Sequence, residues 1–319
     1  MQLLLYLLAL ALVRLLQLLP LPVVAVLGRL AGGATYWIAF RHRRLALANL
    51  TACFASEKSP AQIRAIAREN FRRIGEALCC AVKTAAMDWP DLRHRVQFTG
   101  TGRLLPAPTM SPPSVVVALG RFGQFELFAR FGQFLPAFRC LTTYRALDWP
   151  LLNRLVQSLR EGTGCLFFER RRDANALRTA MSPRGIILGL LADHNAGSGG
   201  VPLPFFGREA PTSTAPAVFA LRYHLSLFTA ICHRTGLARW RIEAGPEIPT
   251  READGRPRPT EAIMLDVNRA FEEAIRRDPA NWFWPQHRWK TEARSQPAGP
   301  GAGSSAEPDA DAAPDAVIE

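Results

Sequence analysis

A cation and a carboxylate five positions apart, Arg121 and Glu126, follow the short apolar run Ser114–Leu119. The run has the continuous Val and Leu character of a buried parallel strand, and functional groups in open α/β sheets gather at the carboxyl ends of such strands. We therefore expect a site here, with Arg121 and Glu126 forming an ion pair, because a buried charge without a partner is costly. Arginine has no acceptor lone pair, so Arg121 itself cannot take a proton from a hydroxyl group.

A second polar segment, residues 191–208, also begins at the end of an apolar run. It reads Leu-Ala-Asp-His-Asn-Ala-Gly-Ser-Gly-Gly-Val-Pro-Leu-Pro-Phe-Phe-Gly-Arg. Its glycines allow backbone N–H groups to approach a ligand, and its prolines and phenylalanines are of the kind that could line an acyl groove. The alternative interpretation is a loop closed by packed phenylalanines.

The elements that must position these segments alternate between apolar runs and helical patterns. The predicted strands lie near residues 114–119, 139–143, 165–169, 185–192, 225–232 and 240–245. The predicted helices between them lie near residues 122–133, 149–161, 173–182 and 214–223. This alternation predicts an α/β fold with a mostly parallel sheet flanked by helices. Amphipathic helices at 59–84 and 260–278 are expected to face the core.

Residues 3–27 form a long apolar segment interrupted by Arg14 and two prolines. Its length is close to the roughly 20 residues that cross a bilayer, and it predicts an N-terminal membrane-anchoring helix. A cleaved signal peptide and a helix packed on the domain are the alternatives. The basic cluster Arg41–Arg44 follows and favours a cytoplasmic location for the rest of the chain. We expect an anchor at 1–40, one α/β domain at 41–290 and a disordered acidic tail at 291–319.

The charge of the chain is uneven. The 319 residues carry a formal net charge of +12, yet residues 291–319 hold one basic residue and six acidic ones. The remainder is therefore strongly basic and suits an anionic partner such as a lipid headgroup or an acidic carrier protein. No nucleic-acid-binding motif accompanies the charge, so nucleic acid is not an expected partner. The six scattered cysteines have no metal-site spacing and are typical of a reduced, cytoplasm-facing domain.

Several segments resemble one protein family, the lipid A biosynthesis (lauroyl/myristoyl) acyltransferases of the lysophospholipid acyltransferase superfamily. The family signature Gly-His-Phe-Gly-Asn-Phe/Trp-Glu is matched at Gly120, Phe122, Gly123, Phe125 and Glu126. Arg121 stands in place of its histidine, and Gln124 in place of its asparagine. Residues 191–208 resemble the Pro-Asp-Gln-Asp, Gly-Gly-Val and Val-Pro-Phe-Phe-Gly segments of the family. The Trp-rich stretch 281–290 resembles its closing motif.

The resemblance implies a glycerolipid-acyltransferase-like fold and a membrane-bound enzyme of the bacterial inner membrane whose domain faces the cytoplasm. Such an enzyme moves a fatty acyl chain from acyl carrier protein, or from coenzyme A, to a hydroxyl of a lipid A precursor or related anionic lipid. Neither a metal nor a cofactor is implied. The catalytic positions it implies are Arg121 and Glu126. The substrate-binding residues it implies are Gly123, Arg145, Arg154, Arg171, Asp193, His194, Gly200, Pro204, Phe205, Phe206 and Gly207.

Arg121 opens a second hypothesis, because the family histidine at this position is the general base that the carboxylate orients. The chain is then a catalytically silent lipid-binding homologue that keeps the anchor, the groove and the basic rim. If another histidine replaces the base, His194 is the best candidate, since it follows a strand end, while His224 and His287 are the others.

Overall fold

The computed structural model describes residues 2–103, 112–182 and 184–289. The expected acidic tail at 291–319 lies outside these residues.

Seven strands form one mixed sheet in the order β1-β9-β8-β2-β5-β3-β4. β2, β3, β4, β5 and β8 run parallel to one another, whereas β9 is antiparallel to β8 and β1 is parallel to β9. The prediction of a mostly parallel sheet is therefore confirmed. The strand bounds are β1 Val96–Thr99, β2 Val115–Leu119, β3 Arg139–Tyr144, β4 Cys165–Glu169, β5 Ile186–Leu191, β8 Ser226–Gly236 and β9 Arg239–Ile248.

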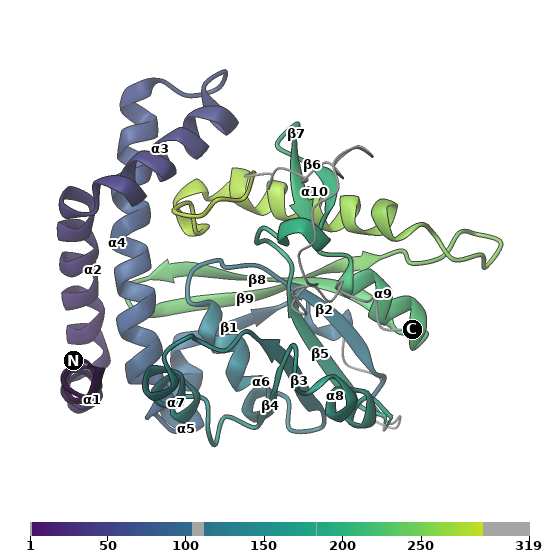
Figure 1. The fold of residues 1–319 in the computed structure, drawn as a ribbon, viewed down its shortest axis with the longest axis horizontal. Helices are drawn as coiled ribbons and strands as arrows, with labels where there is room; N and C mark the ends of the chain where they lie inside the picture. The colour runs from purple at the N-terminus through teal and green to yellow at the C-terminus, as the bar shows by residue number, and fades with distance from the viewer. Residues whose placement is uncertain (1, 104–111, 183, 290–319) are drawn as a thin grey trace, which may run out of the picture.

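Helices cover both faces of this sheet (Figure 1). Side chains of β2 alternate between two hydrophobic cores, with Val116 and Ala118 in one and Val115 and Val117 in the other. Both faces of a parallel strand are buried in this way, which is why the strand reads as an uninterrupted apolar run. The helices of the sheet region are α5 Trp89–Leu92, α6 Phe131–Phe134, α7 Pro150–Ser158, α8 Ala174–Ala180, α9 Ala215–Arg222 and α10 Thr260–Arg277.

The helix expected at 122–133 is replaced by shorter pieces. A 3-10 helix spans Phe125–Arg130 and leads into α6. Gly123 has a φ of 49°, and a Cβ on it would lie 2.6 Å from the carbonyl oxygen of Cys232. A left-handed residue so close to β8 prevents a regular helix from starting at Phe122.

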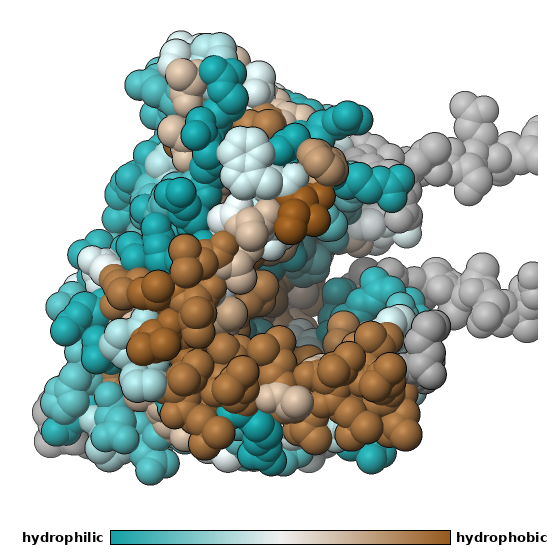
Figure 2. Space-filling view, turned by 90° about the vertical axis from the view of Figure 1, so that its left-hand side faces the viewer, coloured by the Kyte–Doolittle hydropathy of each residue, from teal (hydrophilic) through white to brown (hydrophobic). Residues whose placement is uncertain are grey.

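The apolar N-terminal segment forms two helices instead of one. α1 (Gln2–Leu18) ends before Pro20, and α2 (Leu21–Ile38) follows in a different direction (Figure 1). α2 is long and apolar enough to cross a membrane by length and composition, with 33% of that window buried. Figure 2 shows apolar residues gathered on the side of the molecule that carries these helices. Exposed side chains of this face include Leu4, Leu8, Leu12, Leu15, Val23, Val26, Leu30 and Trp37.

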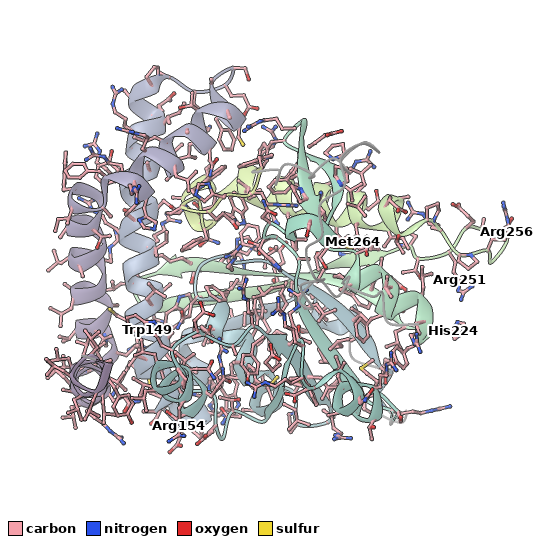
Figure 3. The ribbon with its side chains drawn as sticks, in the orientation of Figure 1. Trp149, Arg154, His224, Arg251, Arg256 and Met264 are labelled. Atoms are coloured by element: carbon pink, nitrogen blue, oxygen red, sulfur yellow. The ribbon has the colours of Figure 1, made fainter. Side chains whose placement is uncertain are left out.

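α2 packs closely against α4 (Pro60–Ala85), while α3 (Phe40–Phe54) connects the two. Glycines allow this close approach, because a Cβ on Gly75 would lie 2.2 Å from the carbonyl oxygen of Gly28. The N-terminus of α4 is capped by Ser59 and Gln62, which bond reciprocally as a capping box. On the opposite side of the molecule, Arg251 and Arg256 lie on the connection between β9 and α10, which extends beyond the sheet (Figure 3).

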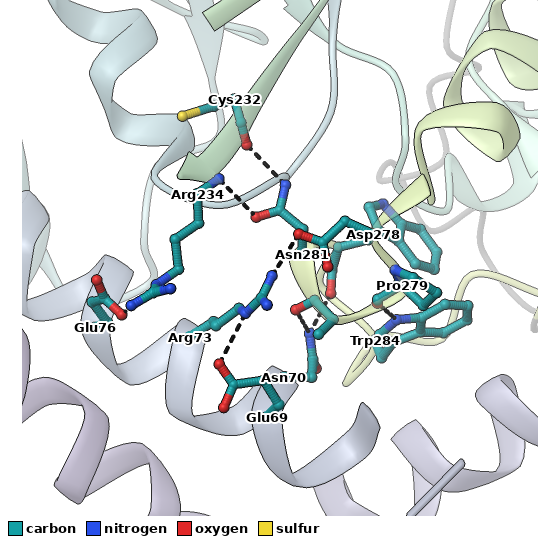
Figure 4. Close-up of polar contacts among 12 residues, drawn as sticks. Glu69, Asn70, Arg73, Glu76, Cys232, Arg234, Asp278, Pro279, Asn281 and Trp284 are labelled. Carbon is teal, nitrogen blue, oxygen red and sulfur yellow. Dashed lines mark hydrogen bonds and ion pairs between the residues drawn. The ribbon is translucent and has the colours of Figure 1, made fainter. Parts of the chain in front are cut away.

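A tryptophan-rich turn, residues 279–289, closes the domain and is bonded to α4 (Figure 4). The side-chain amide of Asn70 donates to the carbonyl oxygens of Ala280 and Trp282, and Arg73 pairs with Asp278 at 2.6 Å. The buried carboxylate of Glu76 accepts from Arg234 at 2.8 Å and from the backbone N–H of Ala238 at 3.0 Å. These bonds fix the tryptophan-rich turn relative to both α4 and β8.

Candidate active site

A cleft of about 610 Å³ lies where the carboxyl ends of the parallel strands meet the tryptophan-rich turn. Its polar lining includes residues that follow or end several strands: Arg121 after β2, Thr143, Tyr144 and Arg145 at the end of β3, Arg170 after β4, His194 and Asn195 after β5, and Ser213 after β7. Gln286 and His287 of the tryptophan-rich turn complete the wall. The parallel topology thus brings residues far apart in sequence to one edge, as the position of Arg121 predicted.

Arg121 is held by the segment that follows β5. Its backbone N–H donates to Asp193 Oδ2 at 2.9 Å, and its Nε lies 3.4 Å from Asp193 Oδ1. Its Nη2 donates to Gln286 Oε1, and its guanidinium lies over the ring of Phe283. Asp193 is fully buried and also accepts from Trp282 Nε1 at 2.8 Å. Arg121 is therefore a fixed cation on the wall of the cleft.

The expected ion pair between Arg121 and Glu126 is wrong. Glu126 instead accepts from Arg160 at 2.7 Å, and that pair lies on the wall between two apolar cavities. The reason is the 3-10 segment at Phe125–Arg130, which replaces the helix that the spacing predicts. The carboxylate that orients residue 121 is Asp193, which is 72 positions away in sequence.

The cleft is electropositive. Among the described residues that line it are three arginines, Arg121, Arg145 and Arg170, and no aspartate or glutamate. Burial lowers the pKa of His194 to about 4, against the opposing effect of Asp193, so its imidazole is neutral at pH 7. Gln286 Nε2 is buried and has no hydrogen-bond partner among the described residues. The cleft thus has one fixed cation, Arg121, two exposed arginines and a neutral imidazole, and the unpaired amide nitrogen of Gln286 is buried in its wall.

The other predicted residues divide into two groups. Arg145 and His194 line the cleft, and Asp193 lies behind Arg121. Gly123 connects the segment after β2 to the tryptophan-rich turn, because its backbone N–H donates to the carbonyl oxygen of Asn281 at 2.8 Å. Arg154 is exposed on α7 and points away from the domain (Figure 3), and Arg171 is exposed beyond β4.

The Gly-Val-Pro-Leu-Pro-Phe-Phe-Gly stretch does not line the cleft. It forms an antiparallel hairpin of β6 (Val201–Phe205) and β7 (Arg208–Thr212), with Phe206 and Gly207 at its turn. Phe205 is fully buried and packs on Trp282 and Trp289, while Phe206 packs on Trp284. Pro204 is exposed, and Gly200 packs against Pro211. In the structure, the packed-phenylalanine interpretation describes this segment.

Arg160, Gln286 and Thr143 were missed by sequence reasoning, and from the basic run 170–172 it chose Arg171 instead of Arg170. Arg170 could have been chosen over Arg171, because it is the first residue after β4. Of the remaining histidines considered as a base, His287 lines the cleft. His224 lies beside Arg251, at 2.8 Å, at the far end of the molecule from the N-terminal helices (Figure 3).

Two smaller pockets adjoin the cleft. The β3–β4 pocket has a volume of about 210 Å³, shares Thr143, Tyr144, Arg145 and Leu191 with the cleft, and has a largely apolar lining. The α8–α9 pocket has a volume of about 280 Å³ and shares Thr143, Arg170, Leu190 and Ser213 with the cleft. The apolar pockets, which suit a hydrocarbon chain, therefore adjoin the cationic cleft, which suits an anionic group, at one edge of the sheet.

Fold and cleft together define a mixed α/β protein whose functional edge combines cations with apolar pockets and whose N-terminal helices expose an apolar face. A family model described as bacterial lipid A biosynthesis acyltransferase matches residues 1–291. The chain belongs to this family of acyltransferases, which confirms the resemblance read from its motifs.

Curated relatives agree with this assignment. The chain is 28% identical over 287 residues to a protein of Escherichia coli (strain K12) named lipid A biosynthesis palmitoleoyltransferase, a match that covers 86% of this chain and 87% of that protein. It is similar to the same extent to a protein of Shigella flexneri named lipid A biosynthesis acyltransferase.

Proposed function

We propose that the protein transfers a fatty acyl chain from acyl carrier protein, or from coenzyme A, to a hydroxyl of a lipid A precursor or related anionic lipid. The observation that carries this proposal is the electropositive cleft that adjoins an apolar pocket at the carboxyl edge of the sheet. The arginines suit an anionic acceptor, and the β3–β4 pocket suits a hydrocarbon chain. The strongly basic domain also suits an acidic carrier protein.

The reaction needs a base that takes the proton of the acceptor hydroxyl. The hydroxyl oxygen then attacks the thioester carbonyl carbon, the carbon–sulfur bond breaks, and the thiolate takes the proton from the protonated base. His194 is our candidate, because it lies in the cleft and its neutral imidazole can accept a proton. Arg121 and the amide of Gln286 lie on the same wall and would stabilise the oxyanion that forms.

The test is acyl transfer by the full-length protein in liposomes, with a labelled acyl chain on acyl carrier protein or on coenzyme A and a lipid A precursor as acceptor. We expect transfer by the wild type and a loss of roughly 10²-fold in His194→Ala, the low end of what a positioned base contributes. His224→Ala is the matched control, because His224 lies outside the cleft. Equal rates in the two variants would remove His194 from the mechanism.

The silent lipid-binding homologue is the second candidate function. The observation that favours it is Arg121, a cation bonded to Asp193 and Gln286 at the position of the family base. Under this hypothesis the wild type binds the acceptor lipid but transfers no acyl chain from either donor. A wild type that turns over many acceptor molecules per protein would contradict it.

We also propose that residues 1–40 bind the bacterial inner membrane, with the domain at 41–290 on the cytoplasmic side. The apolar face of α1 and α2 supports membrane binding, and Arg41, Arg43 and Arg44 follow it directly. Because α2 is packed against α4, this segment is continuous with the domain and not a detachable tether. Reactivity of cysteines introduced at Ala146 and Ala176 towards an impermeant reagent tests the orientation. Labelling in intact spheroplasts, before lysis, would overturn it.

A further inference from the structure

The two pockets that adjoin the cleft lie on opposite faces of the sheet. The β3–β4 pocket is lined by Leu119, Cys140 and Ile187, which belong to one hydrophobic core. The α8–α9 pocket is lined by Leu177 and Leu190, which belong to the other core. Both pockets reach the cleft at Thr143, so that two chains, one on each face, would meet at the carboxyl edge of the sheet.

The wall of the α8–α9 pocket is apolar and aromatic over much of its length. The side chains that form this part are Phe168, Ala174, Leu177, Leu190, Val218 and Phe219. Phe219 and Tyr223 have parallel rings one helical turn apart on α9. Such a wall suits a hydrocarbon chain better than a sugar or a nucleotide phosphate.

The two carboxylates of this pocket are already engaged by the backbone. Glu169 accepts from the N–H groups of Arg171 and Arg172 at 3.0 and 2.8 Å, and Asp173 accepts from the N–H of Glu169 at 2.8 Å. Arg170 lines both the pocket and the cleft, where Arg121 and Arg145 also lie. Of the three arginines that line the pocket, Arg170 lies at its junction with the cleft, where the anionic end of a lipid would lie, while Arg178 and Arg222 line the pocket but not the cleft.

We propose that the α8–α9 pocket binds a hydrocarbon chain that the acceptor lipid already carries, with the anionic group of that lipid at Arg170 in the cleft. The β3–β4 pocket then holds the chain that is transferred, and the acceptor hydroxyl lies between the two pockets. This inference rests on the proposed function for the role of the lipid as an acceptor, but the binding itself does not need catalysis.

The experiment is photolabelling of the full-length protein in nanodiscs of phosphatidylcholine, with the labelled residues mapped by mass spectrometry. The probe is dodecyl phosphate with a diazirine at the chain end. We expect labels on Leu177, Val218 or Phe219. The reference probe, a dodecanoyl thioester of coenzyme A with the same diazirine, should label the β3–β4 pocket near Phe167.

Ala174→Phe and Ala176→Phe form a matched pair on α8. Ala174 lines the pocket, and Ala176 is exposed outside it. Ala174→Phe should lower labelling by dodecyl phosphate about tenfold, the effect of excluding a few methylene groups, and should not change labelling by the thioester. Circular dichroism and the melting temperature show whether both variants fold. If they label equally, the pocket is not the site.

The anionic end is tested separately. Arg170→Gln and the diazirine derivative of dodecanol should each give weaker labelling of the pocket, while excess inorganic phosphate should compete only weakly because it lacks the chain. Full displacement by inorganic phosphate would mean a free phosphate site. Labels confined to α1 and α2, or to the β3–β4 pocket, would overturn the inference. Pocket labelling without acyl transfer would instead support the inference and reject the proposed enzyme.

Discussion

The guanidinium of Arg121 is bonded to Asp193, with Nε 3.4 Å from Oδ1, and the backbone N–H of Arg121 donates to Oδ2 of the same carboxylate at 2.9 Å. Because Trp282 Nε1 donates to Oδ2 as well, at 2.8 Å, one buried carboxylate connects the end of β2, the segment after β5 and the tryptophan-rich turn. The geometry of the cleft depends on this carboxylate.

Removal of the Asp193 carboxylate should destabilise the protein strongly. Asp193→Ala leaves Arg121 without its carboxylate partner and Trp282 without its acceptor, and breaking a buried pair costs roughly 3–5 kcal/mol. Urea unfolding followed by circular dichroism measures the change. Asp254→Ala is the control, since the Asp254–Arg256 pair is exposed, and it should leave the unfolding midpoint unchanged. Similar midpoints for the two variants would contradict the structural role of Asp193.

Histidine at position 121 distinguishes the two candidate functions. If the wild type is the silent homologue and His194 is not its base, Arg121→His should raise the rate by roughly 10²-fold or more, because it supplies a base at the position of the family histidine. In this structure Asp193, and not Glu126, is placed to orient the new imidazole. The gain should therefore disappear when Asp193→Asn is added and persist when Glu126→Gln is added. The reverse pattern would show that residues 121 and 126 come together during the reaction.

The pH dependence of stability should contain a contribution from His194. Burial lowers the pKa of this imidazole to about 4 from its ordinary value of 6.5. Between these values the unfolded chain binds a proton that the folded chain does not, so stability is lost as the pH falls through this window. His194→Asn should make the dependence of Tm on pH flatter. His233→Asn should do the same, since burial also lowers the pKa of His233. If the slope of Tm against pH is unchanged in both variants, this prediction is wrong.

Membrane binding should depend on the exposed face of α1. Leu8 and Leu12 are 58% and 57% exposed there, and a carboxylate at these positions would have to enter the apolar part of the bilayer. The double variant Leu8→Glu, Leu12→Glu should sediment poorly with phosphatidylglycerol vesicles. Leu166→Glu, an exposed leucine on β4, should sediment as the wild type does. Co-sedimentation of the double variant at high salt would argue against insertion of α1.

The contact between α2 and α4 should not tolerate an added methyl group. In Gly75→Ala the new Cβ would lie 2.2 Å from the backbone oxygen of Gly28, so the helices must separate, at a cost of about 1–3 kcal/mol. Gly33→Ala is the matched control, because the atoms nearest to its Cβ belong to the Arg72 side chain at 3.7 Å. Thermal unfolding compares the two. Deleting residues 1–28 should also destabilise the protein, because it removes Leu21, Val24 and Ala25, which are buried.

The central parallel strands were predicted to within a residue at each end, because a strand buried on both faces needs an apolar residue at nearly every position. β4 has the expected bounds, β2 and β3 differ by one residue at one end, and β5 differs by one residue at each end, whereas β8 continues four residues beyond its expected end. The hairpin of β6 and β7 was missed because Pro202, Pro204 and Pro211 cannot donate to a ladder. The break of the N-terminal helix was also missed, although Pro20 marks it.

The position of the site at the sheet edge was predictable, but the ion pairs among its side chains were not. Strand ends in a parallel sheet have to meet at one edge, so Arg121 and His194 could be placed there from their positions, whereas Arg145 came from the family resemblance. Partner choice depends on the local path of the chain, and the left-handed Gly123 turns Glu126 towards Arg160. The burial of Phe205 and Phe206 depends on the tryptophan-rich turn, which is more than 70 positions later in sequence and whose packing no local pattern indicates.

The bonds between α4 and the tryptophan-rich turn also set an order for biosynthesis. Asn70 and Glu76 emerge from the ribosome long before their partners at Ala238, Ala280 and Trp282 have been synthesised. Until then, the side-chain amide of Asn70, which is buried in the finished protein, has to remain in water, since an unpaired buried amide is costly, whereas Glu76 can already pair with Arg29. The wall of the cleft is therefore complete only after Gln286 and His287 have left the exit tunnel.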